Sequence, residues 1–231
     1  MNVAERESLL RSLLAPHLPP EGDAGVILSD RSRRPDHVDP LTFELLCSMM
    51  IWEHEVMAGV DAACRLLASV IDLNDLRVTR ASEMSLLIGV DYPLSLDRCE
   101  RLREVLNSIY EREDCVSIAP LSGRPKRAAE EFLACTHGLC PFAQARVLLA
   151  MGVSALPIDG RALTPMIRAG VFSADTNAHS ARAWVERRLS TAELPRYAVA
   201  VERYGAAESA AAASKPKPKR RPRTPAKKPV E

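Results

Sequence analysis

Apolar residues recur along most of the chain every three or four positions, which is the spacing of amphipathic α-helices. Leu102, Leu106 and Ile109, for example, fall on one face of the stretch 96–113. No segment alternates apolar and polar residues over enough positions to predict a β-strand. The pattern therefore predicts an all-α protein of about nine or ten helices. We expect these helices near residues 3–15, 40–55, 57–71, 80–88, 96–113, 126–135, 142–151, 160–169, 177–189 and 194–204.

Proline, glycine and a change in composition divide this pattern into three segments. Residues 1–38 contain one short helix and a loop rich in proline, glycine and charge. Pro40 starts the next helix, with Asp39 as its N-cap, and opens a helical domain over 39–205. After Gly205 large apolar side chains nearly vanish, and alanine, proline and lysine dominate. Because residues 206–231 cannot bury enough apolar surface to offset their ordering entropy, we predict that they are disordered.

The charge is divided unevenly between the body and the tail. Residues 215–231 carry eight basic residues and one acidic residue, whereas the other 214 residues carry 23 basic and 29 acidic residues. The tail is therefore strongly basic, and the body mildly acidic. A flexible basic strand attracts the phosphates of nucleic acid without sequence preference, although such a segment could also only improve solubility. The candidate DNA contacts in the tail are Lys215, Lys217, Lys219, Arg220, Arg221, Arg223, Lys227 and Lys228.

Composition excludes several classes of protein. Hydrophobic residues make up 47% of the chain but aromatic residues only 4%, so the apolar content is mostly aliphatic and favours helices. No apolar run is long enough to span a membrane, and charges interrupt the N-terminal stretch where a signal peptide would be apolar. The six cysteines form no CxxC pair, so we expect reduced, buried thiols and no disulfide framework or zinc site.

The segment from Leu133 to Gly152 has the form of two helices joined by a tight turn. In a helix-hairpin-helix element, the backbone N–H groups of such a turn lie at the start of the second helix and hold a DNA phosphate without reading sequence. An ordinary helix–helix turn is the alternative. The candidate phosphate contacts are His137, Gly138, Leu139, Cys140 and Pro141.

About twenty residues further on, the segment 155–168 (ALPIDGRALTPMIR) places Asp159 at the start of a helix. This order of hairpin, helix, short apolar stretch and aspartate resembles the endonuclease III-like DNA glycosylases of the helix-hairpin-helix family. The resemblance implies that Asp159 is the catalytic residue. Asp159 could instead serve only as the N-cap of the helix that follows, a role that aspartate fills well without any chemistry.

Weaker matches extend the resemblance over about residues 39–205. The stretch 39–46 (DPLTFELL) is similar to the opening helix of the family, and 87–89 is similar to its central part. Residues 191–194 and 202–205 are similar to its last helix. The resemblance implies an all-α fold of two lobes with a cleft between them and double-stranded DNA as the partner. It also implies hydrolysis of the N-glycosidic bond of a flipped, damaged or mispaired base.

The departures from the family pattern are equally informative. Phe142 falls where bifunctional members carry a Schiff-base lysine, and Lys126 is the only lysine before the tail. We therefore expect no β-lyase activity. No cysteine follows Cys140, so we expect no iron–sulfur cluster and no other cofactor. The hairpin has His137 in place of a proline and Cys140 in place of a glycine.

Other residues have both a functional and a structural interpretation. His54 falls about where a polar side chain would fill the gap left by a flipped base, and Trp52 could line a base pocket; packing is the alternative for both. His137 and His179 are weaker candidates for functional groups. We do not expect a metal site at residues 53–55, because side chains at consecutive positions point around a helix rather than together.

Two hypotheses follow, and the contents of the cleft distinguish them. The first is a monofunctional DNA N-glycosylase of base-excision repair, acting through Asp159. The second is a non-catalytic DNA-binding relative with a basic tethering tail. A cleft that accepts a base and faces Asp159 favours the enzyme, whereas a cleft filled by Met50, Trp52 or Phe142 favours the binder. Under either hypothesis we expect a cytoplasmic, nucleoid-associated monomer that binds no membrane and no metal.

Overall fold

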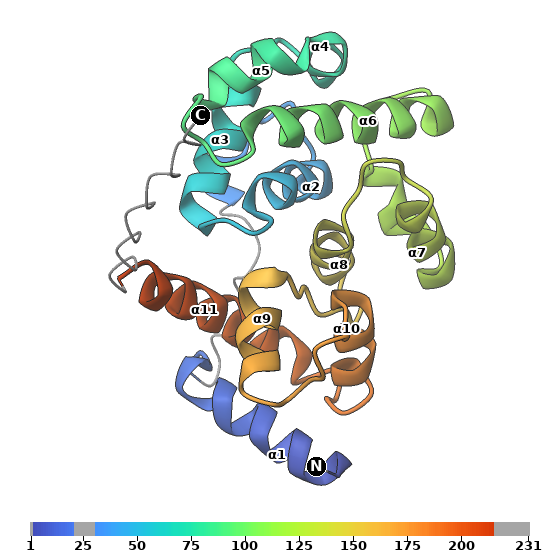
Figure 1. Cartoon of the computed structure of the whole chain (residues 1–231). Coiled ribbons are helices and arrows are strands. Elements are labelled where there is room, and N and C mark those ends of the chain that lie inside the picture. Colours follow the sequence, from blue (N-terminus) through green and yellow to red (C-terminus); the bar gives the residue numbers. More distant parts are fainter. Residues whose placement is uncertain (1, 21–30, 215–231) are drawn as a thin grey trace, which may run out of the picture.

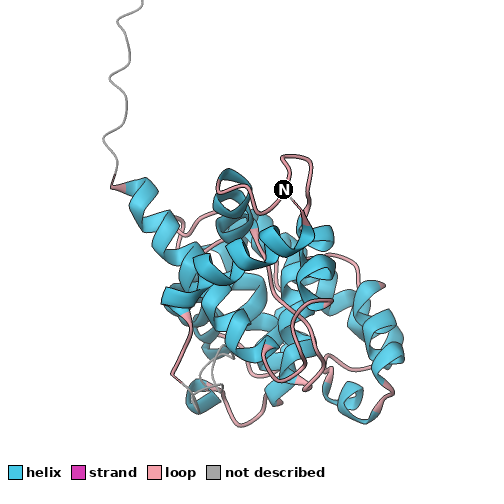
Figure 2. Ribbon diagram, turned by 90° about the horizontal axis from the view of Figure 1, so that it is seen from below, coloured by secondary structure: helices cyan, strands magenta, loops and turns pink. Residues whose placement is uncertain are grey.

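A computed structural model describes residues 2–20 and 31–214, and every regular element within these ranges is a helix (Figures 1 and 2). This confirms the predicted all-α fold. Within these ranges, three short 3-10 helices cover Ala15–His17, Arg31–Arg33 and Ala119–Gly123. The α-helices of the described residues are α1 (Val3–Leu14), α2 (Pro40–Ile51), α3 (Val56–Ala68), α4 (Leu73–Val78), α5 (Ala81–Ile88), α6 (Ser95–Glu113), α7 (Lys126–Ala134), α8 (Pro141–Ala150), α9 (Gly160–Arg168), α10 (Ala178–Glu186) and α11 (Leu194–Ala213).

The helices form two lobes, each built around its own hydrophobic core. The first core gathers buried residues between Val38 and Ala155, from α2 through α8. The second core joins Leu10 and Leu14 of α1 to buried residues of α9, α10 and α11. Figure 1 shows the N-terminal helix α1 below α9 and α11, at the end of the molecule opposite to α4 and α5. The first helix of the chain therefore completes the lobe made by its last three.

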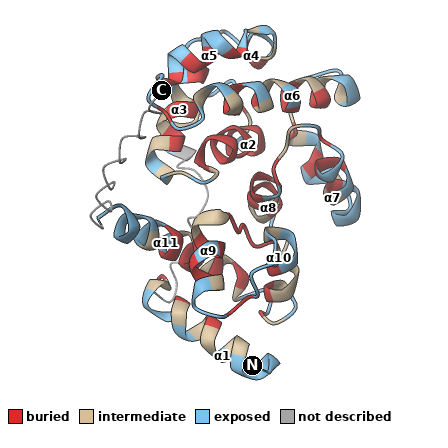
Figure 3. Cartoon of the chain, in the orientation of Figure 1, coloured by how far each residue is buried: buried red, intermediate tan, exposed pale blue. Residues whose placement is uncertain are grey.

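Helix α2 lies at the centre of the first lobe. Every residue from Leu41 to Ile51 is buried, and only one of them, Glu44, is charged. A helix that is apolar on all sides is stable only when other elements surround it. Helices α3, α6 and α8 do so, and Figure 3 shows α2 almost wholly buried.

The start of α2 agrees with the prediction. One carboxylate oxygen of Asp39 accepts the backbone N–H groups of Leu41 (3.0 Å) and Thr42 (2.9 Å), and Pro40 occupies the first helical turn. The other oxygen accepts the hydroxyl of Ser117 (2.7 Å). This N-cap therefore also ties the beginning of α2 to the loop that precedes α7.

The end of α2 differs from the prediction. The helix stops at Ile51 rather than continuing to residue 55, because the chain turns at Trp52 and Glu53. Glu55 instead caps α3, and its carboxylate accepts the N–H groups of Met57 and Ala58. The predicted helix over 57–71 also ends early, at Ala68. The polar stretch beyond it caps a further helix, α4, which the pattern did not predict.

The predicted boundary at Gly205 is wrong. Helix α11 continues through Ala206 to Ala213. Alanine has the highest helix propensity of all residues, so an alanine-rich segment extends a helix whose first half is already packed. Residues 215–231, which hold the predicted tail contacts, lie outside the described residues.

Burial of the cysteines agrees only in part with the expectation of six buried thiols. All six are free. Cys47, Cys99 and Cys140 are buried, Cys64 is half-buried, and Cys115 and Cys135 are exposed. The two exposed cysteines lie just beyond the ends of α6 and α7, where helices meet loops.

Candidate functional site

The hairpin joins α7 to α8 through residues 135–140. Gly138 has φ +78°, a conformation that glycine adopts readily, and the N–H of Leu139 donates to the carbonyl oxygen of Thr136 (3.3 Å). Cys140 has φ −77° and ψ 151°, so cysteine is not strained at the position where the family has glycine. Pro141 then begins α8, where its missing N–H costs no hydrogen bond.

Helix α6 lies directly against this turn. A Cβ atom at position 138 would lie 2.7 Å from the carbonyl oxygen of Arg101 and 2.9 Å from the Cβ of Glu104. Gly138 is therefore required for the approach of α6 as well as for its own backbone angle. As a result, an acidic side chain of α6 stands beside the candidate phosphate site.

Trp52 and the hairpin line one hollow of about 530 Å³ on this side of the molecule. Its acidic residues are Asp97, Glu100 and Glu104, and its one basic residue, Arg101, places its guanidinium 5.0 Å from the centre of the Trp52 ring. Arg101 also pairs with Asp97 (3.1 Å). The hollow is therefore net acidic, which disfavours a phosphate close to the carboxylates.

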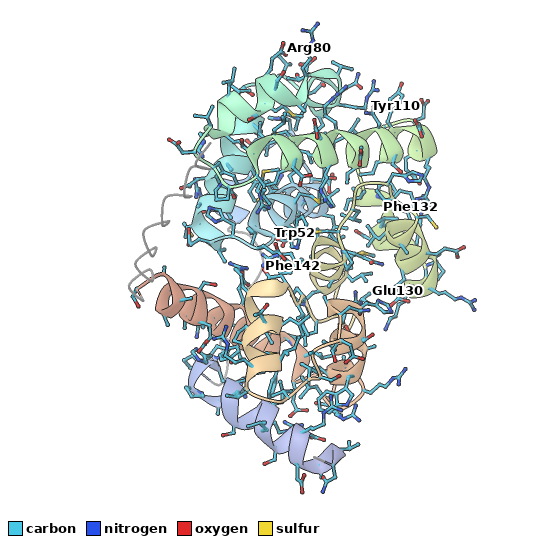
Figure 4. All side chains as sticks on the ribbon, in the orientation of Figure 1. Trp52, Arg80, Tyr110, Glu130, Phe132 and Phe142 are labelled. Carbon is cyan, nitrogen blue, oxygen red and sulfur yellow. The ribbon has the colours of Figure 1, made fainter. Side chains whose placement is uncertain are left out.

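Phe142 occupies the first turn of α8, where the family resemblance would place a lysine. It is buried, with 4% of its surface exposed, and it belongs to the core of the first lobe. Met50 is also fully buried, whereas Trp52 is half-buried. Figure 4 shows Trp52 and Phe142 at the level where α2 and α8 meet the second lobe. Apolar side chains thus fill the space where the resemblance implies a reactive amine.

Asp159 is the N-cap of α9 and is 5% exposed. Its Oδ1 accepts the backbone N–H groups of Arg161 (3.1 Å) and Ala162 (3.4 Å). Its Oδ2 accepts the backbone N–H of Glu53 (3.0 Å) and the Nε–H of Arg161 (2.8 Å). A carboxylate has about four lone-pair sites. Donors of the protein therefore occupy the acceptor sites of this side chain, and Arg161 balances its charge.

Arg161 extends this arrangement across the two lobes. Its Nη1 donates to the backbone carbonyl oxygen of His54, so one guanidinium bonds both Asp159 and the segment that follows α2. Gly160 allows the close approach, because a Cβ there would lie 2.7 Å from Oε1 of Glu53. The Glu53 carboxylate is thereby held at the positive end of the α9 dipole, where a negative charge is stabilised.

The segment Ile51–His54 is a tight turn. The N–H of His54 donates to the carbonyl oxygen of Ile51 (2.7 Å), and Glu53 has φ +53°. A turn of this kind usually has glycine at its third position, and a non-glycine residue there costs about 1 kcal/mol or more. The hydrogen bond from the N–H of Glu53 to Asp159 helps to hold this conformation.

Two further residues secure the beginning of the turn. Arg98 is almost completely buried and its Nη1 donates to the carbonyl oxygens of Met49 (3.0 Å) and Met50 (3.1 Å), which satisfies the end of α2. The hydroxyl of Tyr92 also donates to Met50 (2.8 Å). Burial raises the pKa of that hydroxyl to about 12, so it remains a donor at neutral pH.

His54, the predicted plug residue, packs its ring edge-on against Tyr92, with 4.7 Å between the ring centres. Burial lowers the pKa of His54, and the neighbouring Arg98 lowers it further, so the neutral ring is favoured. His54 follows Trp52 in the turn but does not line the hairpin hollow. Its role as a plug stays a prediction.

The structure brings some of the predicted site residues together and separates others. Gly138, Leu139, Cys140 and Pro141 share one hollow with Trp52. Asp159 contacts the turn Ile51–His54, which contains Trp52, by accepting the N–H of Glu53. His137 is exposed beside the hairpin, whereas His179 lines a separate hollow of about 460 Å³ between α7, α8 and α10.

The sequence interpretation missed a second polar centre between the lobes. Arg146 of α8 is 0% exposed, and it pairs with Glu44 of α2 (2.9 Å) and Glu202 of α11 (3.1 Å). Burial alone would lower the pKa of Arg146, but the two carboxylates raise it, so the guanidinium stays charged. An available signal was the single charged residue inside each of two apolar helices, because such a residue needs a partner.

The described part of the chain contains neither a metal site of the usual ligands nor a membrane-spanning helix. No group of three or more histidine, cysteine or acidic residues there is arranged to hold a metal ion. No helix there combines the length and the apolar character that crossing a bilayer requires.

Comparison with solved structures shows that this two-lobed helical body has an endonuclease III-like fold. The chain is similar to endonuclease III in a trapped covalent complex with DNA (the estranged-adenine complex), with a TM-score of 0.61 and 14% identity, over 87% of this chain and 84% of that one. It is also similar to a thermostable thymine-DNA glycosylase, with a TM-score of 0.58 and 16% identity, over 88% and 87%. No family model matches the sequence, and no curated protein matches it closely enough to be counted.

Proposed function

We propose that the chain binds double-stranded DNA through the hairpin side of the glycosylase fold and that Asp159 supports the structure of this surface rather than base excision. The observation that carries the proposal is the set of four donors around the Asp159 carboxylate. An oxocarbenium-like sugar needs a negative charge beside it, and a water nucleophile needs a free acceptor. A buried carboxylate paired with Arg161 offers neither while this arrangement lasts.

Three features support DNA binding. The fold is that of an endonuclease III whose solved structure is a complex with DNA. Among the described residues, no acceptor is paired with the N–H of Gly138, which is half-buried in the hairpin turn, so this group is available to a phosphate. The sequence after Ser214 adds eight cations and one acid, which favour phosphates by counterion release.

Because the hollow beside the hairpin is acidic, the hairpin and the tail contribute differently to DNA binding. Carboxylates beside Gly138 weaken any phosphate contact there, so the attraction must come mainly from residues 215–231. The hairpin then fixes where the backbone lies. The tail is thus expected to dominate affinity, and the hairpin to determine placement.

The test is duplex binding over a range of salt concentrations, by the full chain and by a chain ending at Ser214. We expect the truncation to weaken binding and to flatten the dependence on salt. A chain of full length in which glutamine replaces the eight cations should behave like the truncation. Unchanged affinity and slope in both variants would contradict the role of the tail.

A second pair of variants tests the hairpin. His137→Glu adds a negative charge beside the turn and should weaken duplex binding several-fold. His179→Glu makes the same change at an exposed histidine on a different hollow and should have little effect. Equal effects of the two substitutions would show that the hairpin side is not the binding surface.

A monofunctional DNA N-glycosylase is the second candidate. It is favoured by the position of Asp159 at the start of α9, at the junction of the lobes. For this activity Arg161 would have to leave the carboxylate when DNA binds. Neither candidate includes a β-lyase step, since Phe142 replaces the amine, so borohydride should not trap the chain on abasic DNA. A covalent adduct within the body would contradict this, and Lys126 would be the residue to examine.

A further inference from the structure

We propose that Asp159 and Arg161 are positioning residues that fix the turn Ile51–His54 and, through it, the placement of Trp52 and His54 on the DNA-binding side. This inference rests on the proposed function for its DNA readout, but its structural readout is independent of DNA.

The turn needs such support because its middle residue is strained. Glu53 adopts φ +53°, which residues other than glycine rarely do. Arg98 and Tyr92 bond Met50, before the turn begins. Apart from the bond within the turn, hydrogen bonds to its middle and its end come from the start of α9, where the N-cap Asp159 accepts the N–H of Glu53 and Arg161 donates to the carbonyl of His54. The second lobe therefore sets the conformation of a turn in the first lobe.

The two carboxylate oxygens of Asp159 bond different groups. Oδ1 caps α9 through the N–H groups of Arg161 and Ala162. Oδ2 bonds the N–H of Glu53 and the guanidinium of Arg161. Asp159→Asn can therefore retain the cap through its one oxygen while its NH₂ group faces two donors. The substitution separates the positioning role from the capping role.

A spectroscopic test uses the two tryptophans of the chain. Trp184 lies in the second lobe, so Trp184→Phe leaves Trp52 as the only reporter of the turn. In that background, Asp159→Asn should shift the Trp52 emission and make the ring more accessible to acrylamide in the absence of DNA. Far-UV circular dichroism should show that α9 and the fold persist. Unchanged emission and accessibility would overturn the proposal.

A rescue experiment isolates the backbone of residue 53. Glu53→Gly removes the strain, because glycine adopts a positive φ freely. Combined with Asp159→Asn it should restore the wild-type emission and accessibility of Trp52. Glu53→Ala removes the same negative charge but keeps the strain, so it should not restore them. Equal behaviour of the glycine and alanine variants would overturn the proposal.

The DNA arm uses the same set of variants. Asp159→Asn should weaken duplex binding about tenfold, the effect of losing one hydrogen bond to a charged group. In the Asp159→Asn background, Glu53→Gly should restore more of the affinity for duplex DNA than Glu53→Ala does. If the wild type binds no duplex, the proposed function fails, while the Trp52 measurements still decide the positioning role.

Arg161→Met provides a second variant in case Asp159→Asn does not fold. It keeps the whole Asp159 cap and removes only the guanidinium that bonds Asp159 and His54. It should also raise the accessibility of Trp52. Arg168→Met, at an exposed arginine near the end of the same helix, serves as the control and should leave Trp52 unchanged. An Arg161→Met protein indistinguishable from this control would contradict the role of Arg161.

Discussion

Two carboxylate–arginine centres join the lobes, and they differ in what they bond. Glu44, Arg146 and Glu202 come from three helices, and their charged groups meet one another in the interior. Asp159 and Arg161 come from one helix start, and both also bond the backbone of a turn. The first centre holds helices together, whereas the second holds a segment at the edge of the candidate binding surface.

The comparison shows that a buried acid beside an arginine does not by itself identify catalysis. In both centres each carboxylate is paired with an arginine and hydrogen-bonded, as buried charges must be. What distinguishes Asp159 is its contact with a strained turn next to Trp52. The two centres should therefore respond differently to substitution.

The largest effect is expected for Arg146→Met. Removing this guanidinium leaves the buried Glu44 and the half-buried Glu202 without their shared partner, and breaking a buried pair costs about 3–5 kcal/mol. Urea denaturation should show a loss of this size in the free energy of unfolding. Arg127→Met removes an exposed arginine and should change it by less than about 0.5 kcal/mol. If Arg146→Met lowered the free energy of unfolding no more than Arg127→Met does, this centre would not hold the two lobes together.

Asp159→Asn should have a smaller effect on stability. Asparagine retains the cap of α9, so the loss comes from the bonds of Oδ2 and should amount to about 1–2 kcal/mol. The same urea measurement tests this. A loss equal to that of Arg146→Met would remove the contrast between the two centres.

The smallest expected effect is a dependence of stability on pH, which arises from Glu202 in the first centre. Burial raises the pKa of Glu202 above its ordinary 4.5, and Arg146 offsets part of the rise. A raised pKa in the folded state means that folding favours the protonated acid, so stability is lost as pH rises from 4.5 through the folded pKa. Glutamine does not ionise. The stability of Glu202→Gln relative to wild type should therefore increase with pH across that window and then level off. A difference that stays flat or falls would contradict the assignment.

Much of the fold followed from local pattern. Pro40 after Asp39 predicted the start of α2, and the spacing of apolar residues predicted α6. The errors arose where local signals compete. Glu53 and Glu55 suit a helix, but contacts with α9 stabilise a turn there, and these contacts lie over a hundred positions away in sequence. The alanines after Gly205 suggest low complexity, but they extend a helix that is already anchored.

The candidate site was predictable in part. The cap position of Asp159 and the hairpin turn at Gly138 agree with the local sequence. The partners of Asp159 were not predictable, because the N–H of Glu53 carries no sequence signal and Arg161 is one arginine among many. The acidity of the hairpin hollow depends on how α6 lies against the turn, which a sequence pattern does not specify.

The central claim is that the chain binds DNA without excising a base, because Asp159 is fully bonded within the protein. The most direct test incubates an excess of the wild-type chain with duplexes that carry deaminated, alkylated, oxidised or mispaired bases, and measures abasic sites by alkaline cleavage. The account predicts that the duplexes are bound and that abasic sites stay at the level of the protein-free control. Abasic sites formed by the wild type on any of these duplexes, and lost in Asp159→Asn, would contradict it.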